Sequence, residues 1–251
     1  MHWTPMEKKV TQNIYDQPEF FAAYSQLPRS LHGLEGSPEW PAARSLLPDL
    51  QRKRVLDLGC GFGWFARWAR KYGAAHVLGL DLSENMIARA KADTDDLGIQ
   101  YAIADLEHVE LPEASFDFAY SSLVLHYVEN FERLAITLFR TLAPHAHFIF
   151  TIEHPIYMAP THPGWSVDKE GRKTWPINCY SIEGPRTTDW LAKGVVKHHR
   201  TIGTTLNTLI GAGFTIRHVL EWAPSTDQIA EHPDLAEEPE RPMILIISAR
   251  R

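Results

Sequence analysis

Short apolar runs alternate with amphipathic stretches through most of the 251-residue chain. Runs of four to eight apolar residues without strict alternation are typical of strands that are buried on both faces. Five such runs come first and two follow near the end, so we expect strands at about 55–58, 76–81, 99–104, 116–121, 147–152, 214–220 and 243–248.

Helical periodicity fills the intervals between these runs. Phe65, Trp68, Ala69 and Tyr72 share one helical face, and Ser83 stands where an N-cap residue is expected. Further helices are predicted near 20–24, 129–143 and 201–212. Strands that alternate with helices predict an α/β fold: a seven-stranded, mostly parallel, doubly wound (Rossmann-like) sheet with helices on both faces.

The chain is expected to form one domain, 1–251, with four parts. Residues 1–50 carry several prolines that keep helices short, and they form a helical cap, whereas 51–152 form the cofactor-binding core. Residues 153–200 are rich in Pro and Gly and contain several Trp and Tyr, which predicts an irregular insertion after strand five that serves as a lid or pocket wall. Residues 201–251 supply the last helix and the last two strands.

The first strand runs into a glycine-rich turn, Asp57-x-Gly59-x-Gly61-x-Gly63, and Asp81 ends the second strand. Glycines let a ligand approach the main chain closely, and a carboxylate at the second strand end can accept both hydroxyls of a ribose. A dinucleotide site needs a third glycine where Trp64 stands, which disfavours NAD. A purely structural turn is the other alternative.

The segment Asp57-Leu-Gly59-Cys-Gly61-Phe-Gly63, followed by Asp81 and Asp105, resembles the class I S-adenosylmethionine-dependent methyltransferases. The resemblance covers about residues 54–152 and is to the branch with a methyltransferase 11-type domain, which acts on small molecules. Outer segments are similar to an uncharacterised bacterial methyltransferase group; these are Tyr24-Ser-Gln-Leu-Pro-Arg29-Ser, Glu153-His154-Pro155, His198-His199-Arg200-Thr201 and Arg241-Pro-Met.

The resemblance implies S-adenosylmethionine as cofactor and S-adenosylhomocysteine as product. It places Asp57 near the cofactor amino group, Asp81 at the ribose and Asp105 at the adenine amino group. Tyr15, Phe20 and Tyr24 would fold over the cofactor as a gate, because aromatic faces attract a cation such as the sulfonium; an N-terminal helix that packs on the domain is the alternative. The expected cofactor-binding residues are Tyr24, Asp57, Gly59, Gly61, Gly63, Asp81, Leu82, Met86, Ala104, Asp105, Leu106, Ser121, Ser122 and Leu123.

Candidate catalytic bases are His126, after the fourth strand, and His154, after the fifth, because the pKa of histidine lies near neutral pH. The candidate substrate-binding residues are Arg29, His199 and Arg200. An arginine forms bidentate hydrogen bonds with a carboxylate or phosphate. For each of these five side chains, a structural role is the more common alternative. The pair His145-x-His147 lacks a third ligand, so no metal site is expected.

The composition of the chain limits the classes of substrate and the location that we expect for the protein. The chain has 25 Lys and Arg against 31 Asp and Glu, a net charge of −6, which disfavours a nucleic-acid substrate. No apolar run is long enough for a membrane span, the N-terminus lacks a signal-peptide pattern, and there are two cysteines, so a cytoplasmic protein is expected.

The sequence thus predicts methyl transfer to O, N or C of a small-molecule acceptor. A cofactor-binding but catalytically silent regulatory protein and, less favoured, an NAD-dependent oxidoreductase remain as alternatives, and the acceptor and the oligomeric state stay open.

Overall fold

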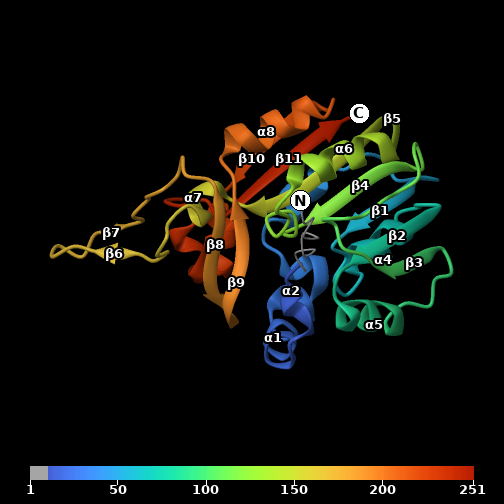
Figure 1. The fold of residues 1–251 in the computed structure, drawn as a ribbon. Helices are drawn as coiled ribbons and strands as arrows, with labels where there is room; N and C mark the ends of the chain where they lie inside the picture. Colours follow the sequence, from blue (N-terminus) through green and yellow to red (C-terminus); the bar gives the residue numbers. More distant parts are fainter. Residues whose placement is uncertain (1–10) are drawn as a thin grey trace, which may run out of the picture.

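A seven-stranded sheet forms the centre of the computed structural model, which describes residues 11–251 (Figure 1). Its strand order is β10–β11–β5–β4–β1–β2–β3. The strands are β1 (Arg54–Leu58), β2 (His76–Asp81), β3 (Ile99–Ile103), β4 (Phe116–Ser122), β5 (Leu142–Glu153), β10 (Thr215–Trp222) and β11 (Ile244–Arg250). All seven predicted strands are present, and the doubly wound fold is confirmed.

The direction of the strands determines where a ligand can bind. Strands β1 to β5 are parallel, whereas β11 is antiparallel to both of its neighbours, β5 and β10. The chain proceeds outward from β1 through β2 to β3 and then returns to the other side of β1 as β4. This reversal creates a crevice beyond the carboxyl ends of β1 and β4, where doubly wound proteins bind their ligands.

Helices cover both faces of the sheet. On one face lie α3 (Trp40–Ser45), α4 (Trp64–Lys71) and α5 (Glu84–Ala92), and on the other lie α6 (Phe131–Thr141) and α8 (Ile202–Gly211). Consecutive strand residues serve opposite faces: Val55 belongs to the core beneath α4, and Leu56 to the core beneath α6. This explains why the central strands are apolar throughout rather than alternating.

Local sequence signals account for most helix ends. Ser83 caps α5, since its hydroxyl accepts a hydrogen bond from the amide of Met86 at 3.1 Å, as predicted. The predicted helix over 129–143 instead ends at Thr141, and β5 begins at Leu142. Pro144 explains this correction, because the residue before a proline avoids the helical conformation.

The insertion after β5 is more regular than predicted. It contains α7 (Pro155–Met158) and two antiparallel hairpins, β6 (Ser166–Val167) with β7 (Lys173–Thr174), and β8 (Gly184–Trp190) with β9 (Ala192–His199). Figure 1 shows β6 and β7 projecting from the body of the molecule. The prediction of irregular structure is therefore wrong for the two hairpins and α7, whereas 159–165 and 175–183 contain no helix or strand. Strand β8 is largely polar, so its sequence lacks the apolar alternation by which strands are recognised.

The N-terminal part forms a helical cap. It comprises α1 (Pro18–Tyr24), α2 (Pro28–Leu31) and α3, each with a proline in its first turn, together with 3-10 helices at Ile14–Asp16 and Gly33–Gly36. Near the other end, α9 (Thr226–Glu231) and a 3-10 helix at Pro233–Glu237 precede β11. Over residues 11–251, the helices are too short or too polar to cross a bilayer.

Candidate functional site

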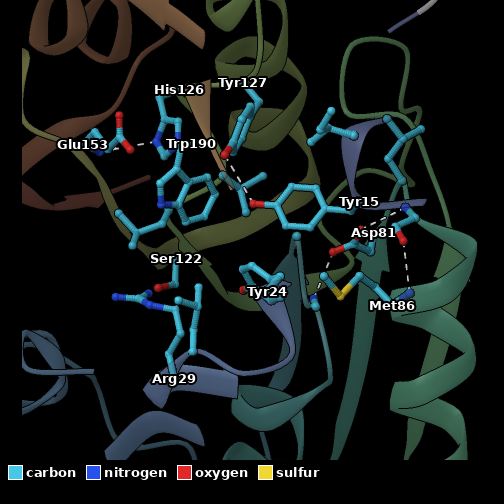
Figure 2. A pocket seen from close by; sticks show the side chains of 18 of the residues that line it. Tyr15, Tyr24, Arg29, Asp81, Met86, Ser122, His126, Tyr127, Glu153 and Trp190 are labelled. Carbon is cyan, nitrogen blue, oxygen red and sulfur yellow. Dashed lines mark hydrogen bonds between the residues drawn. The ribbon is translucent and has the colours of Figure 1, made fainter. Parts of the chain in front are cut away.

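A cavity of about 400 Å³ opens at the carboxyl ends of β1 to β5. Its floor is formed by the strand ends, and its walls by residues 11–15, the cap, the β8–β9 hairpin and the segment before β11. Figure 2 shows Asp81 and Met86 on one side, His126, Glu153 and Arg29 on the other, and Tyr15 between them. We call the first side the Asp81 half and the second the His126 half.

The glycine-rich turn forms the inner edge of the Asp81 half. Gly59 has a φ of +69°, and a Cβ at this position would collide with the side chain of Val124. Gly61 donates its amide hydrogen to Asp81 Oδ2 at 2.9 Å, and Ser83 donates to Asp81 Oδ1 at 3.0 Å. Asp81 thereby holds the turn in place. Each of its oxygens keeps a second lone pair, which suits a diol in the cavity.

Asp57 lies beneath the turn and is 2% exposed. No hydrogen-bond partner for its Oδ2 is found among residues 11–251, while the amide of Ala66 donates to the carboxyl group. Burial, aided by the charge of Asp81, raises the pKa of Asp57 to about 8. A buried carboxyl oxygen without a protein partner is unusual, and it suits a cation or hydrogen-bond donor of a ligand.

Asp105, after β3, is already engaged. Its Oδ2 accepts hydrogen bonds from Thr11 Oγ1 at 2.7 Å and from His108 Nδ1 at 2.9 Å, and its Oδ1 accepts from the amide of Glu107 at 3.0 Å. Burial alone would raise the pKa of Asp105, but the bonds from His108 and Thr11 outweigh it and lower the pKa. Oδ1 retains a lone pair for an amino group.

Residues 11–16, which we call the strap, run along the cavity from Asp105 and the β8–β9 hairpin to the start of α5. The side chain of Gln12 donates to Gly194 O and accepts from Val196 N, both at 2.9 Å. At the other end, Asp16 accepts from the first-turn amides of Glu84 at 3.1 Å and Asn85 at 3.0 Å. The strap therefore joins the hairpin to the start of α5 and covers the Asp81 half.

The His126 half contains buried charges that are paired. Lys197 on β9 forms an ion pair with Glu153 at the end of β5, and its ammonium lies 5.0 Å from the centre of the Trp190 ring. His126 is 2% exposed, and its Nδ1 accepts a hydrogen bond from the amide of Glu153 at 3.3 Å. Burial, with the charges of Lys197 and Arg200, lowers the pKa of His126 well below 6.5.

Aromatic rings line the middle of the cavity, where its two halves meet. Tyr15 donates to the hydroxyl of Tyr127 at 3.3 Å, and its ring packs edge-on against Tyr24 at 5.1 Å (Figure 2). Burial raises the pKa of Tyr15 and, assisted by the charge of Glu153, that of Tyr127. These phenols are therefore protonated at neutral pH.

Twelve predicted site residues line the cavity. They are Tyr24, Arg29, Gly59, Gly61, Asp81, Leu82, Met86, Asp105, Leu106, Ser122, Leu123 and His126. Arg29 is paired with the buried Glu39 at 3.2 Å, so its charge is compensated within the protein.

The other predicted site residues are not part of the cavity lining. Asp57 and Gly63 lie in or beneath the glycine turn, Ala104 follows β3, and the Ser121 hydroxyl donates to Leu58 O at 2.9 Å. The remaining three, His154, His199 and Arg200, lie elsewhere.

These three side chains have structural partners. His154 caps α7 by accepting from Ile156 N at 3.0 Å, and its Nε2 pairs with Glu221 at 2.9 Å. His199 is fully buried, with Nε2 at 2.8 Å from Tyr180 O. Arg200 donates to the carbonyls of Leu125 at 2.6 Å and Val128 at 2.8 Å. The geometry thus favours the structural alternative for all three.

Several lining residues were missed from the sequence. Glu153, Trp190 and Tyr127 were not singled out as site residues, although all three line the His126 half. Trp190 ends the polar strand β8, whose pairing was not predicted. Glu153 stands at the carboxyl end of a parallel strand, and that position is the signal that could have found it.

Comparisons with known proteins agree with this geometry. Residues 56–150 match the family described as a methyltransferase domain. An S-adenosylmethionine-dependent methyltransferase from Mesorhizobium loti has a similar structure, with a TM-score of 0.85 and 62% identity, covering 87% of this chain and 100% of that one.

Two curated sequences extend the comparison. An uncharacterised protein from Haemophilus influenzae is 35% identical over 98% of this chain and 99% of its own length. A malonyl-[acyl-carrier protein] O-methyltransferase from Erwinia billingiae is 35% identical over 40% of this chain and 39% of its own length.

The chain belongs to the S-adenosylmethionine-dependent methyltransferases. It is a Rossmann-like enzyme of this class, and the NAD-dependent alternative is excluded. The residues of the Asp81 half fit the cofactor: Asp57 offers an unpartnered carboxyl oxygen for an ammonium group, and a Cβ on Gly61 would meet only open space, so the turn leaves room for a ligand.

Proposed function

We propose that this enzyme transfers the methyl group to a small-molecule acceptor that binds in the His126 half of the cavity. The observation that carries the proposal is the continuity of the cavity, which runs from Asp81 to His126 and Glu153 behind one aromatic wall. Its volume of about 400 Å³ lies within the range of small-molecule sites. The proposal covers acceptor atoms of all three kinds: oxygen, nitrogen and carbon.

In the Asp81 half, Asp57 would face the amino group of the cofactor and Asp81 the ribose hydroxyls. Met86 is fully buried at the first turn of α5 and, with Leu82, would flank the adenine. The free lone pair of Asp105 Oδ1 would accept from the adenine amino group. Among the predicted cofactor residues, Ser121 and Gly63 would act by shaping the crevice rather than by contact.

S-adenosylmethionine supplies an electrophilic methyl group on a sulfonium when it is bound. The protein then has to align the acceptor, exclude water and accommodate the change in charge. Tyr15, Tyr24 and Trp190 form the wall that keeps water from the reacting atoms. Aromatic faces also attract cations, so the same wall suits a sulfonium.

The Erwinia relative supports an acyl acceptor, because it is named as an O-methyltransferase of malonyl-[acyl-carrier protein]. The alternative of a catalytically silent regulatory protein predicts cofactor binding without turnover. The His126 half favours the enzyme. Methyl transfer requires an acceptor cavity on which polar groups converge, whereas cofactor binding alone does not.

The experiment follows a labelled methyl group. Purified protein and S-adenosylmethionine with a tritiated methyl group are incubated with the ultrafiltrate of a bacterial extract, and in parallel with its nucleic-acid and protein fractions. Label in the ultrafiltrate supports the proposal when the Asp81→Asn variant transfers about tenfold less or lower still, at a cofactor concentration that does not saturate the wild type. Label confined to a macromolecular fraction, or cofactor binding without any transfer, contradicts it.

A further inference from the structure

The tautomer of His126 defines what this side chain can offer an acceptor. Its Nδ1 accepts the amide hydrogen of Glu153 at 3.3 Å, and an acceptor nitrogen carries no proton. The proton of the neutral ring therefore sits on Nε2, as inferred from this hydrogen bond. No hydrogen bond joins Nε2 to another described residue, so an N–H donor is available to a ligand in the cavity that His126 lines.

A ring in this state is a poor general base. Its one lone pair is used by the Glu153 amide, and Lys197 on β9 and Arg200 beyond β9 oppose a second proton. The pKa of His126 is lowered by burial and by these two charges. The base role predicted from the sequence therefore does not fit the geometry, and the role of donor does.

Other groups of the His126 half are also donors or are already paired. Tyr15 and Tyr127 are protonated phenols, Glu153 is neutralised by Lys197, and Arg29 by Glu39. Asp234 also lines the cavity but is exposed to solvent. An acceptor that must lose a proton finds no suitable base among these groups.

Two positive charges, Lys197 and Arg200, act on the ring of His126. Glu153 compensates Lys197, whereas the hydrogen bonds of Arg200 go to the carbonyls of Leu125 and Val128. Burial lowers the pKa of Arg200 to about 10, so the guanidinium remains charged at neutral pH. The charges of Glu107 and Glu183 partly offset this cation, and the positive charge that remains favours an anionic ligand.

We propose that the acceptor is an apolar carboxylic acid, bound as its carboxylate with one oxygen accepting the Nε2–H of His126. This inference rests on the proposed function. Trp190, Tyr157, Leu235 and Met243 line the same half and would pack against the apolar remainder of the acid.

The transfer is balanced without a base. A lone pair of a carboxylate oxygen forms the new bond to the methyl carbon, and the electron pair of the broken carbon–sulfur bond stays on sulfur. One negative and one positive charge disappear, and the products are a neutral methyl ester and a neutral thioether. No proton is released, which matches a site whose ionisable groups are donors or are paired.

The first test observes His126 directly. Nitrogen-15 NMR of histidine-labelled protein saturated with S-adenosylhomocysteine should show the neutral Nε2–H tautomer from mildly acidic to mildly alkaline pH. An Nδ1–H tautomer, or a ring that titrates in that range, overturns the inference.

The second test compares three probes that share a ring and differ in head group: phenylacetate, phenylacetamide and phenethylamine. Phenylacetate alone should shift the His126 Nε2 resonance. We expect His126→Leu to weaken phenylacetate binding about tenfold or more, as loss of a charge-assisted hydrogen bond does, whereas His126→Gln, which keeps an N–H donor, should bind within a few-fold of the wild type. His218→Leu, on the exposed edge strand, is the matched control.

The outcomes separate the two proposals. A stronger response to the amine or the amide, equal binding by both His126 variants, or no response to the acid overturns the inference. Calorimetric titration of the same sample with S-adenosylhomocysteine tests the cofactor site independently. If it binds while the acid does not, the carboxylate assignment alone fails; if it does not bind, the proposed function fails as well.

Discussion

Replacement of Asp57 by asparagine should change how the stability of the ligand-free protein depends on pH. Asp57 is buried, and its pKa rises from the ordinary 3.8 to about 8. Between these values the carboxyl group is protonated in the folded protein and ionised in the unfolded chain. The folded state therefore binds one more proton, and the free energy of unfolding falls as pH rises through this window.

The magnitude follows from the same two values. Each pH unit in the window costs about 1.4 kcal/mol of stability, so at neutral pH Asp57 destabilises the ligand-free fold by about 4 kcal/mol. In Asp57→Asn this slope disappears, because an amide is uncharged at every pH. The amide can still accept from Ala66, but its NH₂ group replaces an oxygen without a partner, so the absolute stability also changes by about 1–3 kcal/mol.

The assay is urea unfolding followed by tryptophan fluorescence, at several pH values between about 5 and 7, without ligand. We expect the wild type to lose about 1.4 kcal/mol per pH unit relative to Asp57→Asn. The other titrating groups are common to both proteins and cancel in the difference. Asp95→Asn, at an exposed position, should keep the wild-type slope. Parallel curves for the wild type and Asp57→Asn would refute the buried neutral carboxyl.

Three further predictions concern ligand binding and the strap. Binding of S-adenosylhomocysteine at neutral pH should release close to one proton, because Asp57 ionises beside the ligand ammonium group. Calorimetry in buffers of different ionisation enthalpy measures the proton release. Zero release would contradict the placement of Asp57 at the ammonium group. Asp81→Asn should weaken this binding about tenfold or more while the circular dichroism spectrum is retained, and unchanged affinity would refute the ribose assignment. Asp16→Ala should lower the free energy of unfolding in urea by about 0.5–2 kcal/mol and should speed ligand release in stopped-flow measurements. Asp93→Ala, at the far end of α5, is the control and should leave the release rate unchanged.

The elements of the fold were predictable because each depends on short stretches of chain. The apolar run before Gly59 identified β1, and the serine at position 83 identified the start of α5. The β8–β9 hairpin was missed because a two-stranded ribbon with one polar strand has no such pattern. Its pairing depends on which segments meet, not on periodicity.

The two halves of the site differed in how far they could be predicted. Gly61, Asp81 and Met86 follow from a motif and from strand ends, and the structure places them around one cavity. The candidate residues of the His126 half depended on single side chains. The Nε2 atom of His154 pairs with Glu221, which lies 67 residues away in the sequence. Nothing near His154 in the sequence indicates that partner.

The amino-acid sequence by itself determined the α/β class, the order of the strands along the chain, the glycine turn and the acidic residues that follow β1, β2 and β3. These features follow from local periodicity and spacing, which a chain carries whatever its tertiary contacts. Only the tertiary structure decided the protonation of Asp57, the tautomer of His126 and the pairing of Glu153 with Lys197. Burial and hydrogen-bond partners set those properties, and both exist only after distant segments have packed together.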